Sequence, residues 1–187
     1  MYRTFAALML LTLAACASAP VVRSPGEIFF DNLSALCGQA FEGRLVEGNP
    51  TDDNFSKSRL VMHVRDCSAS EIRIPFAVGE DRSRTWVITR TADGLRLKHD
   101  HRHEDGSEDV RSNYGGDARG PGTAIRQEFP ADAFSRELFV QEEIPQAVEN
   151  VWALEVEPGS AFAYELSRPG RLFRVVFDLT KPVTPQP

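Results

Sequence analysis

Apolar and polar residues alternate with a period of two along most of this chain, the pattern of β-strands that bury one face. In the stretch LFRVVFDL near the end of the chain, Phe173, Val175, Phe177 and Leu179 share one face and Arg174 lies on the other. The same alternation predicts strands at residues 41–46, 58–66, 71–78, 85–91, 95–103, 108–113, 123–129, 150–157, 161–167 and 172–179.

Two segments carry apolar residues at helical spacing instead. Residues 26–36 (GEIFFDNLSAL) and residues 131–140 (ADAFSRELFV) each predict a short helix. In the second segment Phe134 and Leu138 are four residues apart, and Asp132 lies where a carboxylate favours the start of a helix.

Short turn signals such as Asp93-Gly94 and Pro158-Gly159 separate the predicted strands. About ten short strands with short connections predict an all-β domain, a single antiparallel up-and-down β-barrel of about 8–10 strands, with a β-sandwich as the alternative. We expect this domain to cover residues 31–181, and we expect the Pro-rich residues 182–187 to form a disordered tail. A hollow barrel and a filled one share the same alternation, so the pattern leaves that point open.

Three of the four histidines lie at every second position of the stretch LRLKHDHRHEDG, residues 95–106. If Asp93-Gly94 forms a two-residue turn, Ile88 faces His99 and Trp86 faces His101 across the hairpin. A turn one residue longer would place Arg90 opposite Arg96, and directly opposed like charges are unfavourable. Because side chains alternate along a strand, His99, His101 and His103 then share the face of the apolar residues.

The next turn, at Asp105-Gly106, gives a second estimate of the same orientation. It places Arg102 opposite Asp109 on the solvent face and His103 opposite Glu108 on the inner face. The same register brings His99 opposite Ser112. Both hairpins therefore predict that the three histidines point toward the interior of the barrel or its mouth.

An inward row of histidines has three interpretations. It can be a polar network in which His103 bonds Glu108 and His99 bonds Ser112, because buried ring nitrogens need partners. It can line a pocket for a small organic molecule, with His99, His101, His103 and Trp86 in its wall. It can also bind zinc or another divalent metal through His99, His101, His103 and Glu108. Alternate residues on a strand are about 6.7 Å apart and Zn–N bonds are about 2.1 Å long, so one ion reaches two neighbouring histidines rather than all three.

Other motifs give weaker evidence for a function. Residues 113–122 (NYGGDARGPG) are Gly-rich but lack the Lys-Ser/Thr ending of a phosphate loop, and we interpret them as a mobile loop or lid. The chain has no G-x-S-x-G motif, so a serine hydrolase has no support. His63 falls opposite the apolar residues of its strand, and we expect it to be exposed.

The first twenty residues, MYRTFAALMLLTLAACASAP, predict export. Arg3 precedes an uncharged apolar run that is shorter than the roughly 20 residues of a membrane-spanning helix, as in a signal peptide over residues 1–19. Two cleavage sites compete: an A-x-A site at residues 17–19, and residues 13–16 (LAAC), which resemble a lipobox with lipidation of Cys16. The second predicts a periplasmic protein anchored to the outer membrane, with residues 20–30 as a tether; the first predicts a soluble periplasmic or secreted one.

The net charge limits the binding partners that we expect, and the cysteine content predicts a disulfide. The formal net charge is −6, and no basic stripe interrupts it, so we exclude nucleic acid and expect membrane contact only through a lipid anchor. About 160 residues remain after export, enough for one core. In an oxidising compartment Cys37 and Cys67 predict a disulfide.

Three stretches, DRSRTWVITR, LRLKHDHRHEDGSED and FAYELSRPGRLFRVVFDLT, resemble a family of secreted proteins and lipoproteins of Gram-negative bacteria, over about residues 31–181. The family has no assigned chemistry and so implies no functional residues. A meander of short strands with a late helix is also similar to lipocalin-like barrels, which bind small apolar ligands; the row of histidines is more polar than such barrels have. We therefore expect a barrel that binds a small molecule or metal ion, rather than an enzyme. The alternatives are a structural or interaction lipoprotein of the envelope and a metal-dependent hydrolase using two histidines and Glu108.

Overall fold

The computed structural model describes residues 22–185. The predicted signal peptide, the lipidation of Cys16 and the last two residues of the predicted tail lie outside this range.

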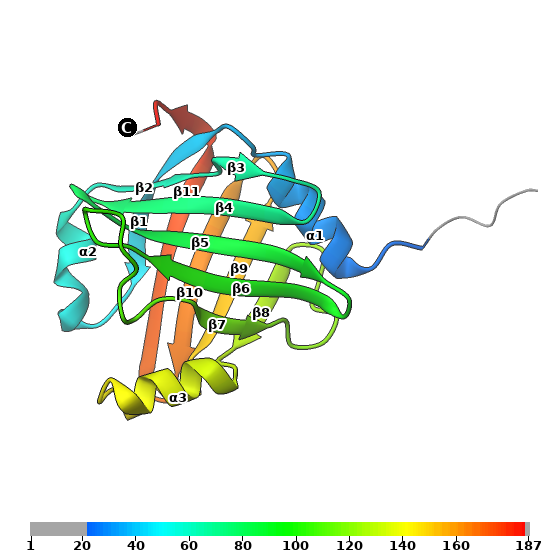
Figure 1. Cartoon of the computed structure of the whole chain (residues 1–187). Coiled ribbons are helices and arrows are strands. Elements are labelled where there is room, and N and C mark those ends of the chain that lie inside the picture. The colour runs from blue at the N-terminus through cyan, green and yellow to red at the C-terminus, as the bar shows by residue number, and fades with distance from the viewer. Residues whose placement is uncertain (1–21, 186–187) are drawn as a thin grey trace, which may run out of the picture.

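The described chain contains three α-helices, two 3-10 turns and a set of antiparallel strands (Figure 1). The helices are α1 (Pro25–Ser34), α2 (Asp53–Lys57) and α3 (Ala133–Gln141), and the 3-10 turns are η1 (Pro50–Asp52) and η2 (Pro145–Glu149). The strands are β1 (Ala40–Glu47), β2 (Leu60–His63), β3 (Asp66–Cys67), β4 (Glu71–Val78), β5 (Asp81–Thr91), β6 (Gly94–His101), β7 (Tyr114–Asp117), β8 (Arg126–Pro130), β9 (Val151–Glu157), β10 (Ala161–Arg168) and β11 (Arg171–Val183).

Ten of these strands form a nearly closed antiparallel barrel in the order β7-β6-β5-β4-β2-β1-β11-β10-β9-β8, and β3 pairs with β4 beside it. Neighbours in the barrel follow one another in the chain, apart from β2 and β4, which the short β3 separates, and β1 and β11, whose pairing joins the two halves. The predicted up-and-down barrel is confirmed, and the alternative of a sandwich is wrong.

The last strand runs further than the sequence pattern indicated. In β11, Pro182 pairs with Phe41 and Val183 pairs with Ala40 of β1. Residues 182 and 183 therefore belong to the barrel, and the prediction of a disordered tail from residue 182 is wrong for them. The solvent-facing positions at a strand end tolerate proline, which is why composition alone misplaced this boundary.

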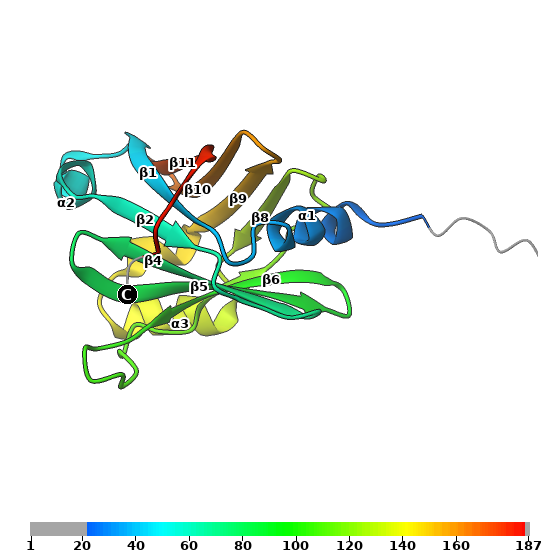
Figure 2. The same ribbon diagram turned by 90° about the horizontal axis from the view of Figure 1, so that it is seen from above.

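Helix α1 closes one end of the barrel. Its N-terminus has a capping box, in which the Ser24 hydroxyl accepts from the Glu27 amide and the Glu27 carboxylate accepts from the Ser24 amide. Phe29, Phe30 and Leu33 on one side of the helix are buried in the main core. The helix was predicted within residues 26–36, but it begins at Pro25, inside the stretch expected to be a tether. Figures 1 and 2 place α1 and α2 at opposite ends of the barrel.

A disulfide joins the end of the α1 segment to the sheet. The Cα atoms of Cys37 and Cys67 are 6.3 Å apart, and the bond links positions 30 residues apart in the chain. The predicted pairing is confirmed.

The seam of the barrel lies between β7 and β8, and two glycines of β7 allow close approach, Gly115 to β6 and Gly116 to β8. A Cβ on Gly115 would lie 2.0 Å from the Leu97 carbonyl oxygen, and one on Gly116 would lie 1.9 Å from the Pro130 carbonyl oxygen. Gly115 also has a φ of 149°, which side chains rarely adopt. The Gly-rich segment is thus partly a strand, and its interpretation as a mobile loop or lid is wrong for residues 114–117.

Helix α3 packs beside this seam. The Asp132 carboxylate accepts from the Ser135 amide and caps the helix, as its position in the sequence predicted. Asp132 also pairs with Lys98 at 2.6 Å, and the Asp132 amide donates to the Gly115 carbonyl. The helix therefore links β6, β7 and β8.

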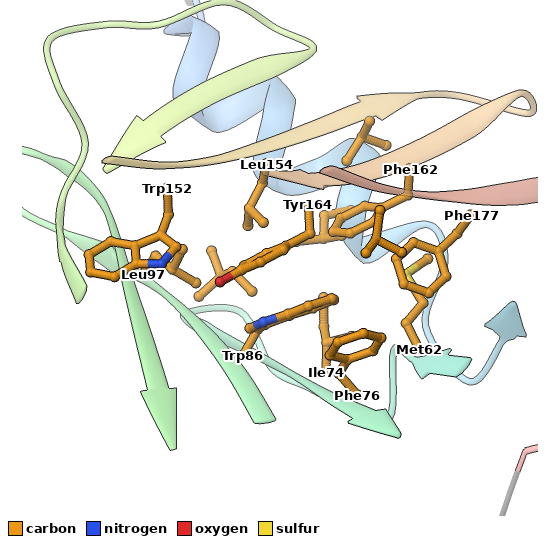
Figure 3. Packing of buried hydrophobic residues seen from close by; sticks show 14 of the residues in the cluster. Met62, Ile74, Phe76, Trp86, Leu97, Trp152, Leu154, Phe162, Tyr164 and Phe177 are labelled. Atoms are coloured by element: carbon orange, nitrogen blue, oxygen red, sulfur yellow. The ribbon is translucent and has the colours of Figure 1, made fainter. Parts of the chain in front are cut away.

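Aromatic side chains fill most of the barrel interior (Figure 3). Trp86 and Phe76 from one wall meet Tyr164, Phe162 and Phe177 from the other, and the Trp86 and Tyr164 rings stack with centroids 4.5 Å apart. The barrel is therefore largely filled, and a space remains between its walls toward the end opposite α1.

Candidate functional site

The β5–β6 hairpin orients His99 and His101 as predicted, but with a different register, and His103 lies beyond its end. Trp86 lies opposite His99 and Arg84 lies opposite His101, two residues away from the expected pairing. A shift of two residues preserves the face on which each side chain lies, so His99 still points inward. The turn is Ala92-Asp93, and Gly94, with a φ of 145°, begins the next strand.

The following hairpin does not form as predicted. Residues 108–113 are not a strand; after the isolated pairing of Arg102 with Glu108 the chain loops out and returns as β7, where Tyr114 pairs with His99. Ser112 therefore does not bond the His99 ring; its hydroxyl accepts from the His101 amide instead. The sequence missed Tyr114 as the true partner because it lies in the Gly-rich segment.

His99 is buried and both of its ring nitrogens are satisfied. Nδ1 lies 3.2 Å from the Tyr114 carbonyl oxygen and Nε2 lies 2.9 Å from the Tyr164 hydroxyl. A carbonyl only accepts, so Nδ1 carries the proton and Nε2 accepts from Tyr164. Burial lowers the pKa of His99 to about 3. His99 is therefore neutral near pH 7 and holds two tyrosines in place.

His101 lies nearer the opening. Its Nε2 is 3.1 Å from the Tyr114 hydroxyl, and burial, with Arg84 nearby, lowers its pKa. Burial also raises the pKa of Tyr114 and of Tyr164. All four polar rings are thus uncharged near neutral pH and can donate or accept single hydrogen bonds.

The remaining two predicted ligands lie elsewhere. The His103 side chain is 57% exposed, with its Nε2 3.9 Å from the Asp109 carboxylate, and Glu108 pairs with Arg102. Among residues 22–185, no three His, Cys, Asp or Glu side chains are grouped so that they could hold one metal ion. The proposed set of His99, His101, His103 and Glu108 does not assemble, because the chain turns away from the barrel after His101. His63 is half-buried rather than exposed.

Three of the predicted ligand-binding residues line one cavity at the end opposite α1. Trp86, His99 and His101 form part of the wall of a space of about 150 Å³. Aromatic and apolar side chains complete most of the wall, and two arginines complete the rest: Phe55, Phe76, Arg84, Tyr114, Tyr164, Leu166, Arg171 and Phe173.

The cavity opens into a wider cleft at the mouth of the barrel, of about 940 Å³. Residues of η1, η2 and the strand ends line this cleft, and His101, Tyr114 and Tyr164 line both spaces. Arg171 at its edge forms two hydrogen bonds, of 2.7 and 2.9 Å, with the buried carboxylate of Asp52. A molecule with its body in the cavity can therefore extend into a polar cleft.

The sequence pattern gave a partial signal for the opposite wall. Phe162, Tyr164 and Leu166 alternate along one strand and so share its inner face. That pattern did not predict which residues of the other strands they contact.

No family profile, curated protein or solved structure matches this chain. Within residues 22–185, no helix combines the length and the apolar character needed to cross a membrane.

Proposed function

We propose that this protein is an exported, lipid-anchored β-barrel that binds a small planar organic molecule in the cavity lined by Trp86, His99 and His101. The observation that carries the proposal is a cavity walled by aromatic rings and neutral hydrogen-bonding groups inside an otherwise filled barrel. A concave, mostly apolar space with a few polar groups beside a packed core is the usual setting of a small-molecule site.

The size and chemistry of the wall support a small ring. A cavity of roughly 150 Å³ in another protein accepts benzene. Flat walls suit a flat molecule, because aromatic pairs gain from stacked and edge-on contacts. The Tyr114 hydroxyl and His101 Nε2 bond each other, and the Tyr114 oxygen keeps a lone pair that can accept from a polar substituent. This wall suits an organic molecule better than a metal ion, for which the described residues hold no ligand set.

The first twenty residues support the location. Their apolar run and the LAAC stretch favour export and lipidation of Cys16. A disulfide between Cys37 and Cys67 is compatible with an oxidising compartment. The test is fractionation of cells that express the full chain: the protein should be in the membrane fraction, and Cys16→Ser should move it to the soluble periplasmic fraction. A protein that stays in the cytoplasm would overturn this part.

Native mass spectrometry tests the binding. The protein of residues 20–187, which includes every described strand and helix, would be exported to a periplasm and purified. We expect a mass excess that matches a small organic molecule, its loss in His101→Ala, and its retention in the matched control His103→Ala. Both variants should keep the wild-type circular dichroism spectrum. An excess that matches a metal would contradict the organic ligand.

A structural or interaction lipoprotein of the envelope is the second candidate. The observation that favours it is the near-complete filling of the barrel by aromatic side chains. If the protein carries only its own mass and no small aromatic compound shifts the Trp86 indole signal in an NMR titration, this second candidate replaces the first.

A further inference from the structure

Four arginines line the wider cleft at the mouth of the barrel. Its wall includes Arg84, Arg111, Arg168 and Arg171 but only two acids, Asp52 and Asp109, whereas the chain has a formal net charge of −6. An arginine in a concave surface attracts an anion most strongly where no carboxylate of the protein already pairs with it.

Three of the four arginines have a carboxylate partner. Arg84 contacts Asp81 at 2.6 Å, Arg111 contacts Glu142 at 3.2 Å, and Arg171 makes its two bonds to Asp52. Their charges are therefore largely compensated within the protein.

Arg168 is different. Its Nη1 donates to Asn150 Oδ1 at 2.9 Å, and none of the described carboxylates forms an ion pair with it. It is half-buried, and burial and the neighbouring Arg171 lower its pKa more than the nearby Asp52 raises it. A partly desolvated cation with only a neutral partner is unfavourable unless an anion joins it.

The position of Arg168 connects it with the cavity. Tyr164, Leu166 and Arg168 are alternate residues of β10 and so share its inner face, with about 6.7 Å between neighbours. Tyr164 and Leu166 line both the cavity and the cleft, and Arg168 lines the cleft. A molecule that lies along this strand face has its body against aromatic rings and its outer end at Arg168.

We infer that the ligand is an organic acid, with a planar body in the aromatic cavity and a carboxylate bound by Arg168. The planar guanidinium matches a carboxylate through paired hydrogen bonds, which a point-like cation does not. This inference rests on the proposed function, since it names the chemical class of the molecule in that cavity.

The experiment is an NMR titration of the protein of residues 20–187, followed at the Trp86 indole N–H. The probes are benzoate, phenylacetate and phenylpropionate, each with its primary amide as the uncharged counterpart. We expect the best acid to bind about tenfold or more tightly than its amide, because a hydrogen bond to a charged group is worth roughly that factor. The three acids differ in the distance between ring and carboxylate, so their relative affinities show which distance reaches Arg168.

Variants assign the effect to one residue. Arg168→Gln should remove the preference for the acid and leave the affinity for the amide within about twofold. Arg111→Gln is the matched control, because it removes one positive charge from the same cleft at a residue already paired with Glu142. It should keep most of the preference for the acid.

The outcomes separate the two proposals. If acids and amides shift Trp86 with equal affinity, the cavity binds small rings but the carboxylate inference is wrong. If Arg111→Gln removes the preference as fully as Arg168→Gln does, the cleft attracts anions by overall charge and Arg168 is not the binding residue. If no probe shifts Trp86, the proposed function fails and the inference fails with it.

Discussion

The two ends of this barrel are closed in different ways. At one end α1 inserts Phe29, Phe30 and Leu33 into the core, and the nearby disulfide holds the segment in place. At the other end short turns surround an opening where rings, hydroxyls and arginines meet. The same strands run from one end to the other. The difference between the ends therefore comes from the helix and turns that connect the strands.

The difference shows where stability and binding are located. Apolar burial at the α1 end needs no specific partner and contributes in proportion to area. At the mouth the polar groups are stabilised by specific hydrogen bonds, such as that between His99 and Tyr164 and that between Arg171 and Asp52. We therefore expect substitutions at the α1 end to change folding strongly and substitutions at the mouth to change binding.

Removing an aromatic ring from the closed end should have the largest effect. Phe30 is 1% exposed, and Phe30→Ala should lower the free energy of unfolding by about 3–5 kcal/mol, measured by urea denaturation. Phe134→Ala is the matched control, because Phe134 is 52% exposed, and it should cost less than about 1 kcal/mol. Equal losses in the two variants would contradict the role given to α1.

Loss of the disulfide should come next. The double variant Cys37→Ser, Cys67→Ser should be less stable by about 2–4 kcal/mol, because the bond closes a loop between positions 30 residues apart. Wild-type protein treated with reductant should lose the same amount in the same urea experiment. A reduced protein as stable as the oxidised one would show that α1 holds its place through packing alone.

The pH dependence of stability should distinguish the buried histidine from the exposed one. The folded-state pKa of His99 is about 3 and its ordinary value is 6.5, so below pH 6.5 the unfolded chain takes up a proton that the folded protein does not. Wild-type stability should therefore fall by about 2 kcal/mol between pH 6 and pH 4 through this group. His99→Gln should remove that part of the slope and His103→Gln should not. Identical slopes for wild type and His99→Gln would contradict the burial of a neutral ring.

The smallest effect on stability should be at Arg168. Arg168→Gln should lower the free energy of unfolding by less than about 1 kcal/mol, because its one hydrogen bond is to the neutral Asn150 and the Gln amide can still donate there. Arg171→Gln, which leaves the buried Asp52 without its two bonds, should cost about 1–3 kcal/mol. If Arg168→Gln proved the more damaging of the two, its charge would be needed for folding rather than left for a ligand.

Much of the fold and part of the site could be predicted from the sequence. Alternation assigned Trp86 and His99 to the inner face although the hairpin register was wrong by two residues, because only a shift of one exchanges the faces. Helical spacing and the cap at Asp132 located α3 to within two residues at its start. The Gly-rich segment was wrongly interpreted as a loop over residues 114–117, because glycine occurs where backbones approach closely as well as in loops.

By itself the sequence determined the alternation, the two longer helices and the cysteine pair, because each depends on residues near one another or on a count. Only the tertiary structure decided that Tyr114 and Tyr164 satisfy His99, that His103 and Glu108 lie away from it, and that Arg168 has no acidic partner among the described residues. These facts depend on which strands meet across the barrel. Each such contact is set by the closure of many strand pairs at once, and no local pattern encodes it.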